Sequence, residues 1–224
     1  AFKHAGAEAN TKVDIFWIEA ESINEEEEQR LLNEAHAILI PGGFGDRGIE
    51  GKIHAATYAR ENKVPFLGVC LGFQLAVIEF CKNVCGLVEA NSTEFDCETP
   101  HPVIALLPEQ KGVKDLGATM RLGSHKVILD DDGMAAMLYG RTEIFERHRH
   151  RYEVNLEFKD QIEKNGLHFT GRSKDGIRME VAELEDHPYY LACQFHPEFK
   201  SRPQKTSPFH LGLVRAALKY KNSL

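Results

Sequence analysis

The most constraining feature of the sequence is an apolar strand pattern that runs directly into an apolar helix pattern. Residues 65–69 form the strand-like run, and residues 71–80 continue with apolar positions at helical spacing. An earlier strand-like run, residues 37–40, stops at Pro41-Gly42-Gly43, and residues 48–62 again have helical spacing. Strand and helix alternating in this order predict parallel β-α-β units with right-handed crossovers.

The second half of the chain has a different pattern, with successive strand-like runs and short connections that favour antiparallel pairing. These runs are residues 102–107, 119–129, 167–172, 179–185 and 189–194. Residues 13–18 are also strand-like, and residues 209–220 predict a closing helix. We therefore expect one α/β domain, residues 1–224, with a mixed, largely parallel sheet flanked by helices and antiparallel strands in its second half.

Composition excludes several classes of function. The formal net charge is −7, from 27 Lys and Arg against 34 Asp and Glu, whereas a general nucleic-acid binder needs a basic surplus. No apolar run approaches the ~20 residues that a membrane span needs. The five cysteines are an odd number without framework spacing, which indicates free thiols and a cytoplasmic location.

The segment Gly68-Val69-Cys70-Leu71-Gly72 is the sharpest chemical signal in the chain. A residue on a tight strand-to-helix turn has strained backbone angles, and glycines on either side make room for it. The turn also places the thiol at a helix N-terminus, where backbone N–H groups favour the thiolate. Cys70 is therefore a candidate nucleophile. The alternative is a small buried cysteine between two packing glycines.

A cysteine nucleophile needs a base, and the base needs a group that orients it. Gln194-Phe195-His196-Pro197-Glu198 follows a predicted strand and offers both. In an extended chain the side chains of His196 and Glu198 fall on the same side, so the carboxylate can hold one imidazole nitrogen. With eleven histidines in the chain, His196 stands out through its place at a strand end and its carboxylate neighbour.

The glycine-rich segment Pro41-Gly42-Gly43-Phe44-Gly45 follows a predicted parallel strand. It lacks the lysine and hydroxyl of a P-loop, and its spacing differs from the dinucleotide fingerprint. An oxyanion hole fits better, with the backbone N–H of Gly43 beside that of Leu71, the residue after the nucleophile.

In this order, these segments resemble the class I, triad-type glutamine amidotransferases, which have a flavodoxin-like α/β fold. Further stretches narrow the resemblance to the glutaminase domain of CTP synthases, over nearly the whole chain. The stretches are Pro41 to Gly48 (PGGFGDRG), Asn91 to Phe95 (NSTEF), Gly117 to Gly123 (GATMRLG), Glu146 to Asn155 (ERHRHRYEVN) and Gln194 to Phe199 (QFHPEF).

The resemblance implies a role for each matching residue. Cys70 would be the nucleophile, His196 the general base and acid, and Glu198 the orienting carboxylate. Glu94 would meet the α-ammonium group of glutamine, and Arg151 its α-carboxylate. The other residues implied in glutamine binding are Gly43, Leu71, Gly72, Phe73 and Gln74. Arg121 lies on a loop that the resemblance associates with activation by GTP.

The resemblance also implies partners that lie outside this chain. Glutamine hydrolysis would supply ammonia to a synthetase domain of the same polypeptide, which aminates UTP to CTP with ATP and Mg²⁺. No cofactor or metal is expected in this chain. The full-length enzyme would be a homotetramer, with filaments as a further assembly. The family's domain opens with an apolar strand, so we expect the protein to extend upstream of Ala1.

Two alternatives remain open from the residues alone. Another γ-glutamyl hydrolase of the same fold would share the cysteine and histidine but act on γ-glutamyl peptides. A non-catalytic regulatory module would keep the fold, although an intact Cys70, His196 and Glu198 argue against it. His148 and His150 alternate like residues on one strand face, but without a cysteine or carboxylate at ligand spacing they are weak metal ligands.

Overall fold

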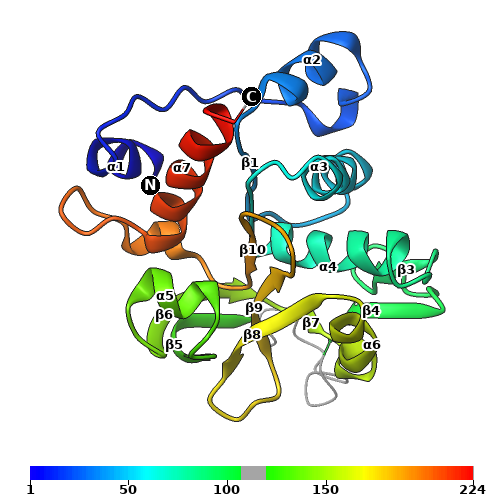
Figure 1. Ribbon diagram of the computed structural model, residues 1–224. Helices are drawn as coiled ribbons and strands as arrows, with labels where there is room; N and C mark the ends of the chain where they lie inside the picture. Colours follow the sequence, from blue (N-terminus) through cyan, green and yellow to red (C-terminus); the bar gives the residue numbers. More distant parts are fainter. Residues whose placement is uncertain (107–119, 224) are drawn as a thin grey trace.

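The computed structural model describes residues 1–106 and 120–223. Within these residues a seven-stranded sheet has the order β1-β2-β10-β9-β8-β5-β6, and a three-stranded sheet has the order β3-β4-β7 (Figure 1). The large sheet comprises β1 (Ile38–Ile40), β2 (Phe66–Val69), β5 (Arg121–Leu129), β6 (Glu143–His150), β8 (Leu167–Ser173), β9 (Met179–Leu184) and β10 (Tyr190–Cys193). The small sheet comprises β3 (Ala90–Ser92), β4 (His101–Ala105) and β7 (Glu153–Val154). The α/β fold with a mixed sheet is confirmed.

The parallel part of the large sheet is smaller than expected. β2 pairs in parallel with β1 and β10, whereas the pairings from β10 through β9, β8 and β5 to β6 are antiparallel. Parallel neighbours need long crossovers, while antiparallel strands can be joined by short turns. The short connections of the second half therefore enlarge the antiparallel part. The predicted strand at residues 102–107 lies in the small sheet as β4, and Leu107 lies outside the described residues.

Helices cover both faces of the parallel strands, and each face has its own core. On one face α3 (Ile49–Glu61) packs on α4 (Leu71–Asn83), which contacts β1 and β2. On the other, α7 (Pro208–Lys221) contacts β2 and packs against α1 (Phe2–Glu8) and α5 (Met134–Tyr139) (Figure 1). Along β2, Phe66 belongs to the first core and Leu67 to the second. The strand is apolar throughout because both of its faces are buried.

The remaining elements lie outside these two layers. α6 (Lys159–Lys164) packs on β8, and α2 (Glu26–Glu34) buries Leu32. Short 3₁₀ helices occur at η1 (Ala20–Ser22), η4 (Leu156–Phe158) and η5 (Pro197–Lys200). The predicted helices at residues 48–62, 71–80 and 209–220 are confirmed as α3, α4 and α7.

The predicted strand at residues 13–18 is wrong. This segment is irregular, and Trp17 is 85% exposed, with Ile15 and Phe16 at 45% and 49%. An apolar run forms a strand only when another strand pairs with its backbone, and no described strand pairs with this one. The strand expected upstream of Ala1 stays a prediction.

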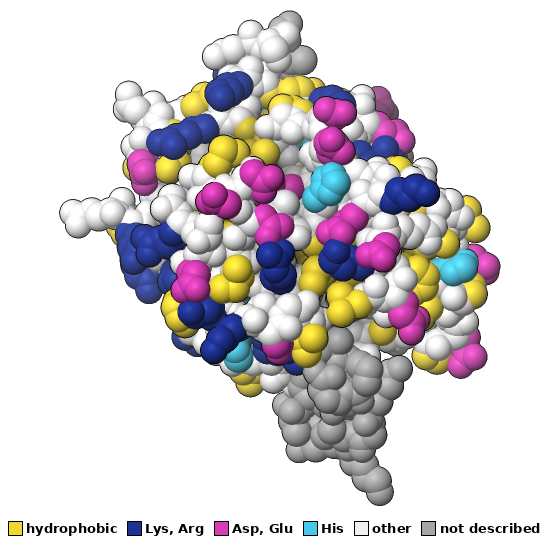
Figure 2. Space-filling model, turned by 60° about the horizontal axis from the view of Figure 1, so that its bottom comes forward, with side chains coloured by type: hydrophobic (Ala, Val, Ile, Leu, Met, Phe, Trp, Pro, Cys, Tyr) yellow, Lys and Arg dark blue, Asp and Glu magenta, His cyan; other side chains and the backbone are white. Residues whose placement is uncertain are grey.

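The surface drawn in Figure 2 has basic and acidic side chains intermixed over most of its area. No helix in the described ranges combines the length and apolar character needed to cross a bilayer.

Candidate active site

The turn between β2 and α4 holds Cys70 in the predicted strained conformation. Its backbone φ is +53° and its ψ is −98°, outside the regions that a non-glycine residue ordinarily adopts. A Cβ on Gly68 would lie 2.6 Å from the carbonyl oxygen of Gly72, and a Cβ on Gly72 would lie 2.2 Å from that of Ile40. The two glycines are therefore required for the chain to bend here, as the pattern predicted.

The Cys70 thiol is buried, and its pKa reflects that burial. Burial raises the pKa to about 12, the backbone N–H of Leu71 and the side chain of Gln194 act to lower it, and Glu198 and Glu94 raise it further. Sγ lies 3.7 Å from the carbonyl oxygen of Arg149, to which the thiol can donate. Burial thus outweighs the effect of the helix N-terminus that was expected to favour the thiolate, so the thiol keeps its proton and needs a base.

His196 follows β10 and is held from three directions. Its backbone N–H donates to the carbonyl of Arg147 at 2.8 Å, and its Nδ1 lies 2.6 Å from Oε1 of Glu198. Its ring stacks on Phe199, with centroids 4.7 Å apart and planes 8° from parallel. The contact with Glu198 was predicted for an extended chain, but the chain turns into η5 at Pro197, and this short helix brings the carboxylate back to the ring.

The base and the nucleophile lie beside the same glycine, Gly42. A Cβ built on this glycine would lie 2.7 Å from Cε1 of His196 and 3.5 Å from Cβ of Cys70. Because Glu198 holds Nδ1, the imidazole has Nε2 left for the sulfur. The lack of a side chain at residue 42 therefore leaves the space in which the two groups approach each other.

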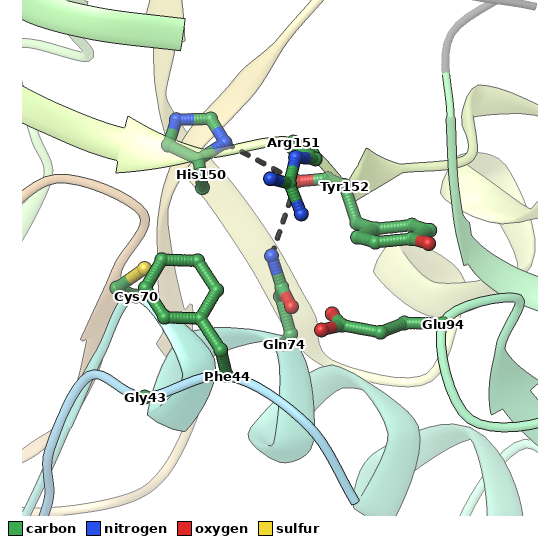
Figure 3. A pocket seen from close by; sticks show the side chains of 8 residues that line it. All are labelled: Gly43, Phe44, Cys70, Gln74, Glu94, His150, Arg151 and Tyr152. Carbon is green, nitrogen blue, oxygen red and sulfur yellow. Dashed lines mark hydrogen bonds between the residues drawn. The ribbon is translucent and has the colours of Figure 1, made fainter. Parts of the chain in front are cut away.

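A small pocket opens beside Cys70 (Figure 3). Its lining includes five of the residues predicted from the sequence, namely Gly43, Cys70, Gln74, Glu94 and Arg151. Phe44, His150 and Tyr152 complete it. The free volume is only about 10 Å³, roughly the room that one water molecule needs. A substrate the size of glutamine requires this pocket to open.

The loop after β1 closes the pocket through two contacts. The backbone N–H of Gly45 donates to Oε1 of Glu94 at 3.2 Å. The guanidinium of Arg149 lies over the ring of Phe44, 5.5 Å from its centroid, and Phe44 is half exposed. Cation–π contacts at exposed positions are worth about 0.5–1 kcal/mol, and a hydrogen bond to a charged group contributes about 1.5–3 kcal/mol.

A model of the family "Glutamine amidotransferase class-I" matches residues 1–216 of this chain. The chain belongs to the class I glutamine amidotransferase family. Among solved structures, the glutaminase domain of Trypanosoma brucei CTPS with bound acivicin is 36% identical, with a TM-score of 0.91 over 97% of this chain and 85% of that one. A glutamine amidotransferase from Thermotoga maritima, at 14% identity and a TM-score of 0.58, shares the fold.

Curated CTP synthases are closer in sequence to this amidotransferase chain. The enzyme of Archaeoglobus fulgidus is 58% identical over 221 residues, which are 99% of this chain and 41% of that protein. The enzyme of Methanocaldococcus jannaschii is 55% identical, over 97% of this chain and 42% of its own length. The chain thus spans about two fifths of the length of these relatives. The predicted resemblance to the glutaminase domain of CTP synthases is confirmed.

Three residues predicted to bind glutamine in this amidotransferase lie in the first turn of α4 rather than in the lining. Leu71 and Phe73 are buried in the core, and Phe73 packs edge-on against Phe169. Gly72 packs against the backbone of Ile40. The side chains of this turn face the core because the helix is apolar on nearly all sides. The turn can contribute backbone N–H groups, of which that of Leu71 is adjacent to the sulfur.

Arg121 does not line the pocket of the amidotransferase. It donates to Glu180 at 2.6 Å and lies 4.0 Å from Glu153, and both carboxylates are buried. The motif that carries it begins at Gly117 to Thr119, outside the described residues. Its predicted role in GTP activation stays a prediction.

The histidines weighed as metal ligands have other partners. His148 Nε2 lies 2.8 Å from Glu180, and His150 Nδ1 lies 3.2 Å from the carbonyl oxygen of Tyr152. Burial lowers the pKa of both imidazoles, so both are neutral near pH 7. Within residues 1–106 and 120–223, no group of three His, Cys, Asp or Glu side chains is arranged to hold a metal ion.

Three residues that contact the site have no individual role predicted from the sequence, namely Gln194, Gly42 and Tyr152. Gln194 is fully buried, with its amide nitrogen 3.8 Å from Sγ of Cys70. A polar residue at the end of an otherwise apolar strand, two positions before the candidate base, is the signal that could have identified it. Gly42 acts through its lack of a side chain, and Tyr152 contributes its carbonyl oxygen as well as a side chain in the lining, which residue type alone does not reveal.

Proposed function

We propose that this chain hydrolyses L-glutamine to glutamate and ammonia, as the glutaminase part of a CTP synthase. The observation that carries the proposal is the placement of Cys70 and His196 beside the same glycine, Gly42, with Glu198 on Nδ1 of the imidazole. A thiol, a base and an orienting carboxylate in this arrangement are what nucleophilic acyl transfer needs.

The reaction follows from these groups. Nε2 of His196 takes the proton of the Cys70 thiol, and the sulfur attacks the side-chain amide carbon of glutamine. The backbone N–H groups of Gly43 and Leu71 hold the oxyanion, a contribution of about 3–4 kcal/mol for each donor. His196 then protonates the leaving nitrogen, ammonia departs, and a γ-glutamyl thioester remains. Water activated by His196 releases glutamate.

The polar lining of the pocket fits the two ends of an amino acid. Glu94 offers a carboxylate to the α-ammonium group, and Arg151 offers a guanidinium to the α-carboxylate. In the closed pocket Glu94 accepts a hydrogen bond from Gly45, so a bound ammonium group would compete with the loop for this carboxylate. Glutamine binding is therefore coupled to release of the loop after β1.

The wider setting is that of a CTP synthase. The relatives are more than twice as long as this chain. We assign the additional length of these relatives to a synthetase domain, which uses ATP and Mg²⁺ to aminate UTP with the released ammonia. GTP as an activator that acts near Arg121, a homotetramer and a cytoplasmic location belong to the same proposal. The chain itself takes part without a cofactor.

The test is release of glutamate from glutamine by this chain alone and by the chain joined to a synthetase domain. Cys70→Ser should abolish release while the far-ultraviolet circular dichroism and the unfolding midpoint stay unchanged, and Cys97→Ser, at an exposed cysteine, should have no effect. Near-normal release by Cys70→Ser would contradict the proposal. Cleavage of γ-glutamyl peptides in preference to glutamine would instead identify a γ-glutamyl hydrolase, and no turnover in either form would favour a non-catalytic module.

A further inference from the structure

The side chain of Gln194 is a buried polar group of the site that the mechanism above does not use. The residue directly follows β10, and none of its surface is exposed. Its backbone N–H donates to the carbonyl of Glu180 at 2.9 Å, which anchors the main chain. Its side-chain amide, in contrast, points toward the nucleophile, with Nε2 3.8 Å from Sγ of Cys70.

The chemistry of the neighbouring groups determines which end of the Gln194 amide faces the sulfur. Nε2 of Gln74 lies 3.1 Å from the carbonyl oxygen of Tyr152 and 3.2 Å from Oε1 of Gln194 (Figure 3 shows the first of these bonds). A carbonyl oxygen only accepts hydrogen bonds, so Gln74 must present its NH₂ group to Tyr152. The second proton of that NH₂ group goes to Oε1 of Gln194. The NH₂ group of Gln194 is therefore the one that faces Cys70.

We infer that Gln194 is a catalytic residue that donates a hydrogen bond to the Cys70 thiolate, and that Gln74 is a positioning residue that holds Gln194 in the donating orientation. The inference rests on the proposed function for its effect on turnover. When His196 takes the thiol proton, the sulfur becomes an anion in a buried site. Before the attack on glutamine, the N–H of Leu71 and the NH₂ group of Gln194 are its donors, and no proton leaves either of them.

A neutral donor suits this position better than a charged one would. The carboxylates of Glu198 and Glu94 act on the buried sulfur and oppose its ionisation. A lysine or arginine next to Cys70 would counter them, but it would also compete with His196 for Glu198. An amide stabilises the anion by hydrogen bonding alone and leaves the pair of His196 and Glu198 intact.

The test is the rate at which iodoacetamide alkylates Cys70 between pH 7 and pH 10, read by mass spectrometry of the peptide that contains this residue. Gln194→Met removes the donor. The loss of one hydrogen bond to an anion should raise the thiol pKa by about one unit. The alkylation rate should fall about threefold, because tenfold less thiolate is partly offset by its greater nucleophilicity.

Gln194→Glu keeps the shape of the side chain and separates loss of the donor from a steric effect. A carboxyl group loses its proton before a thiol with a pKa of about 12 does, so the sulfur would face a second anion. The alkylation rate should then fall at least tenfold. Gln161→Met is the matched control, because the Gln161 amide donates to the carbonyl of Cys85 on the surface, and it should leave the rate unchanged.

Wild-type alkylation rates in both folded Gln194 variants would overturn the inference. If neither folds, Gln74→Met gives the answer, because it leaves Gln194 in place without its orienting partner and should also slow alkylation. Alkylation needs no glutamine, so a failure of the proposed glutaminase function leaves this result readable. In a chain that does turn glutamine over, Gln194→Met should lower kcat with little change in KM, and the reverse pattern would contradict a role at the sulfur.

Discussion

The two parts of the large sheet are stabilised by different means. The parallel strands β1, β2 and β10 are almost wholly apolar and lie between two hydrophobic cores. The antiparallel strands carry buried charge, most clearly where Glu180 of β9 meets Arg121 of β5 and His148 of β6. The candidate pocket receives Cys70 from the first part and His150, which ends β6, from the second.

The two parts of the sheet therefore have different roles: the parallel part carries the reacting groups, and the antiparallel part supports the fold. At the carboxyl ends of β1, β2 and β10 lie the glycine-rich loop, Cys70 and His196, respectively, as expected where parallel strands end at one edge of a sheet. The charges of the antiparallel strands face one another instead. We therefore expect substitutions at the parallel edge to change rates, and substitutions among the buried charges to change stability.

Glu180→Gln should have the largest effect on stability. The substitution leaves the guanidinium of Arg121 without its closest carboxylate in a buried place, and breaking such a pair typically costs about 3–5 kcal/mol. Urea unfolding at pH 7 measures the loss. At a temperature where the variant is folded, its kcat for glutamine should stay within about threefold of the wild type.

The matched control is Glu143→Gln, which breaks an ion pair with Lys126 at the surface. Such pairs contribute about 0–1 kcal/mol, so the free energy of unfolding should hardly change. If Glu180→Gln and Glu143→Gln lowered the free energy of unfolding equally, buried ion pairs would be no more important for stability than exposed ones. A large fall in kcat for Glu180→Gln with little loss of stability would contradict the separation between the two parts of the sheet.

His187, which lies just before β10 in the apolar part of the sheet, should make the protein less stable in acid. Its Nε2 donates to the carbonyl of Ala59 and its Nδ1 accepts from the N–H of Tyr189, so the folded protein holds it neutral. Burial lowers its pKa from 6.5 to about 4. The unfolded chain therefore binds a proton first as the pH falls below 6.5, and stability decreases down to about pH 4, by at most about 3 kcal/mol for this residue.

Urea unfolding at a series of pH values between 7 and 4.5 measures this slope. In His187→Gln the decrease should be shallower, although the starting stability is lower because a hydrogen bond is lost. His210, whose pKa is likewise about 4, contributes in the same direction and keeps some slope in the variant. A slope unchanged by His187→Gln would show that this imidazole titrates normally in the folded protein.

The features that the sequence predicted well are local ones. The turn at Cys70 follows from one strand, one helix and two glycines within five residues, so its strain can be read without knowing the rest of the fold. The features that it missed depend on distant segments. Residues 13–18 have strand-like composition but no pairing partner among the described strands, and the thiol pKa follows from burial by the whole domain.

Gly42→Ala tests whether the parallel edge of the sheet controls the rate rather than the stability. The new methyl group would lie 2.7 Å from Cε1 of His196, closer than atoms in contact allow, so the ring must move. Displacing a reacting group by about 1 Å can cost about 10²-fold in rate. We expect kcat for glutamine to fall by about that factor while the stability changes little, as measured by glutamate release and urea unfolding.

Gly176→Ala is the control in the antiparallel part. Gly176 has a φ of +76° with open space around it, so a side chain there strains the backbone without touching the site. It should lower stability by about 1 kcal/mol and leave kcat unchanged. If Gly42→Ala and Gly176→Ala changed both quantities alike, the loss at Gly42 would reflect backbone strain rather than a displaced base.

Glu198→Gln should lower kcat less than Gly42→Ala does, and comparison with His196→Ala separates the contribution of the carboxylate from that of the imidazole. The amide can still accept a hydrogen bond from Nδ1 of His196, but it no longer offers a charge to stabilise the imidazolium that forms when Cys70 is deprotonated. We expect about a tenfold fall in kcat, against about 10³-fold for His196→Ala, which removes the base itself. Equal rates for Glu198→Gln and the wild type would mean that Phe199 and the backbone hold the imidazole without the carboxylate. A fall as large as that of His196→Ala would mean that the position of the ring depends on the charge of Glu198.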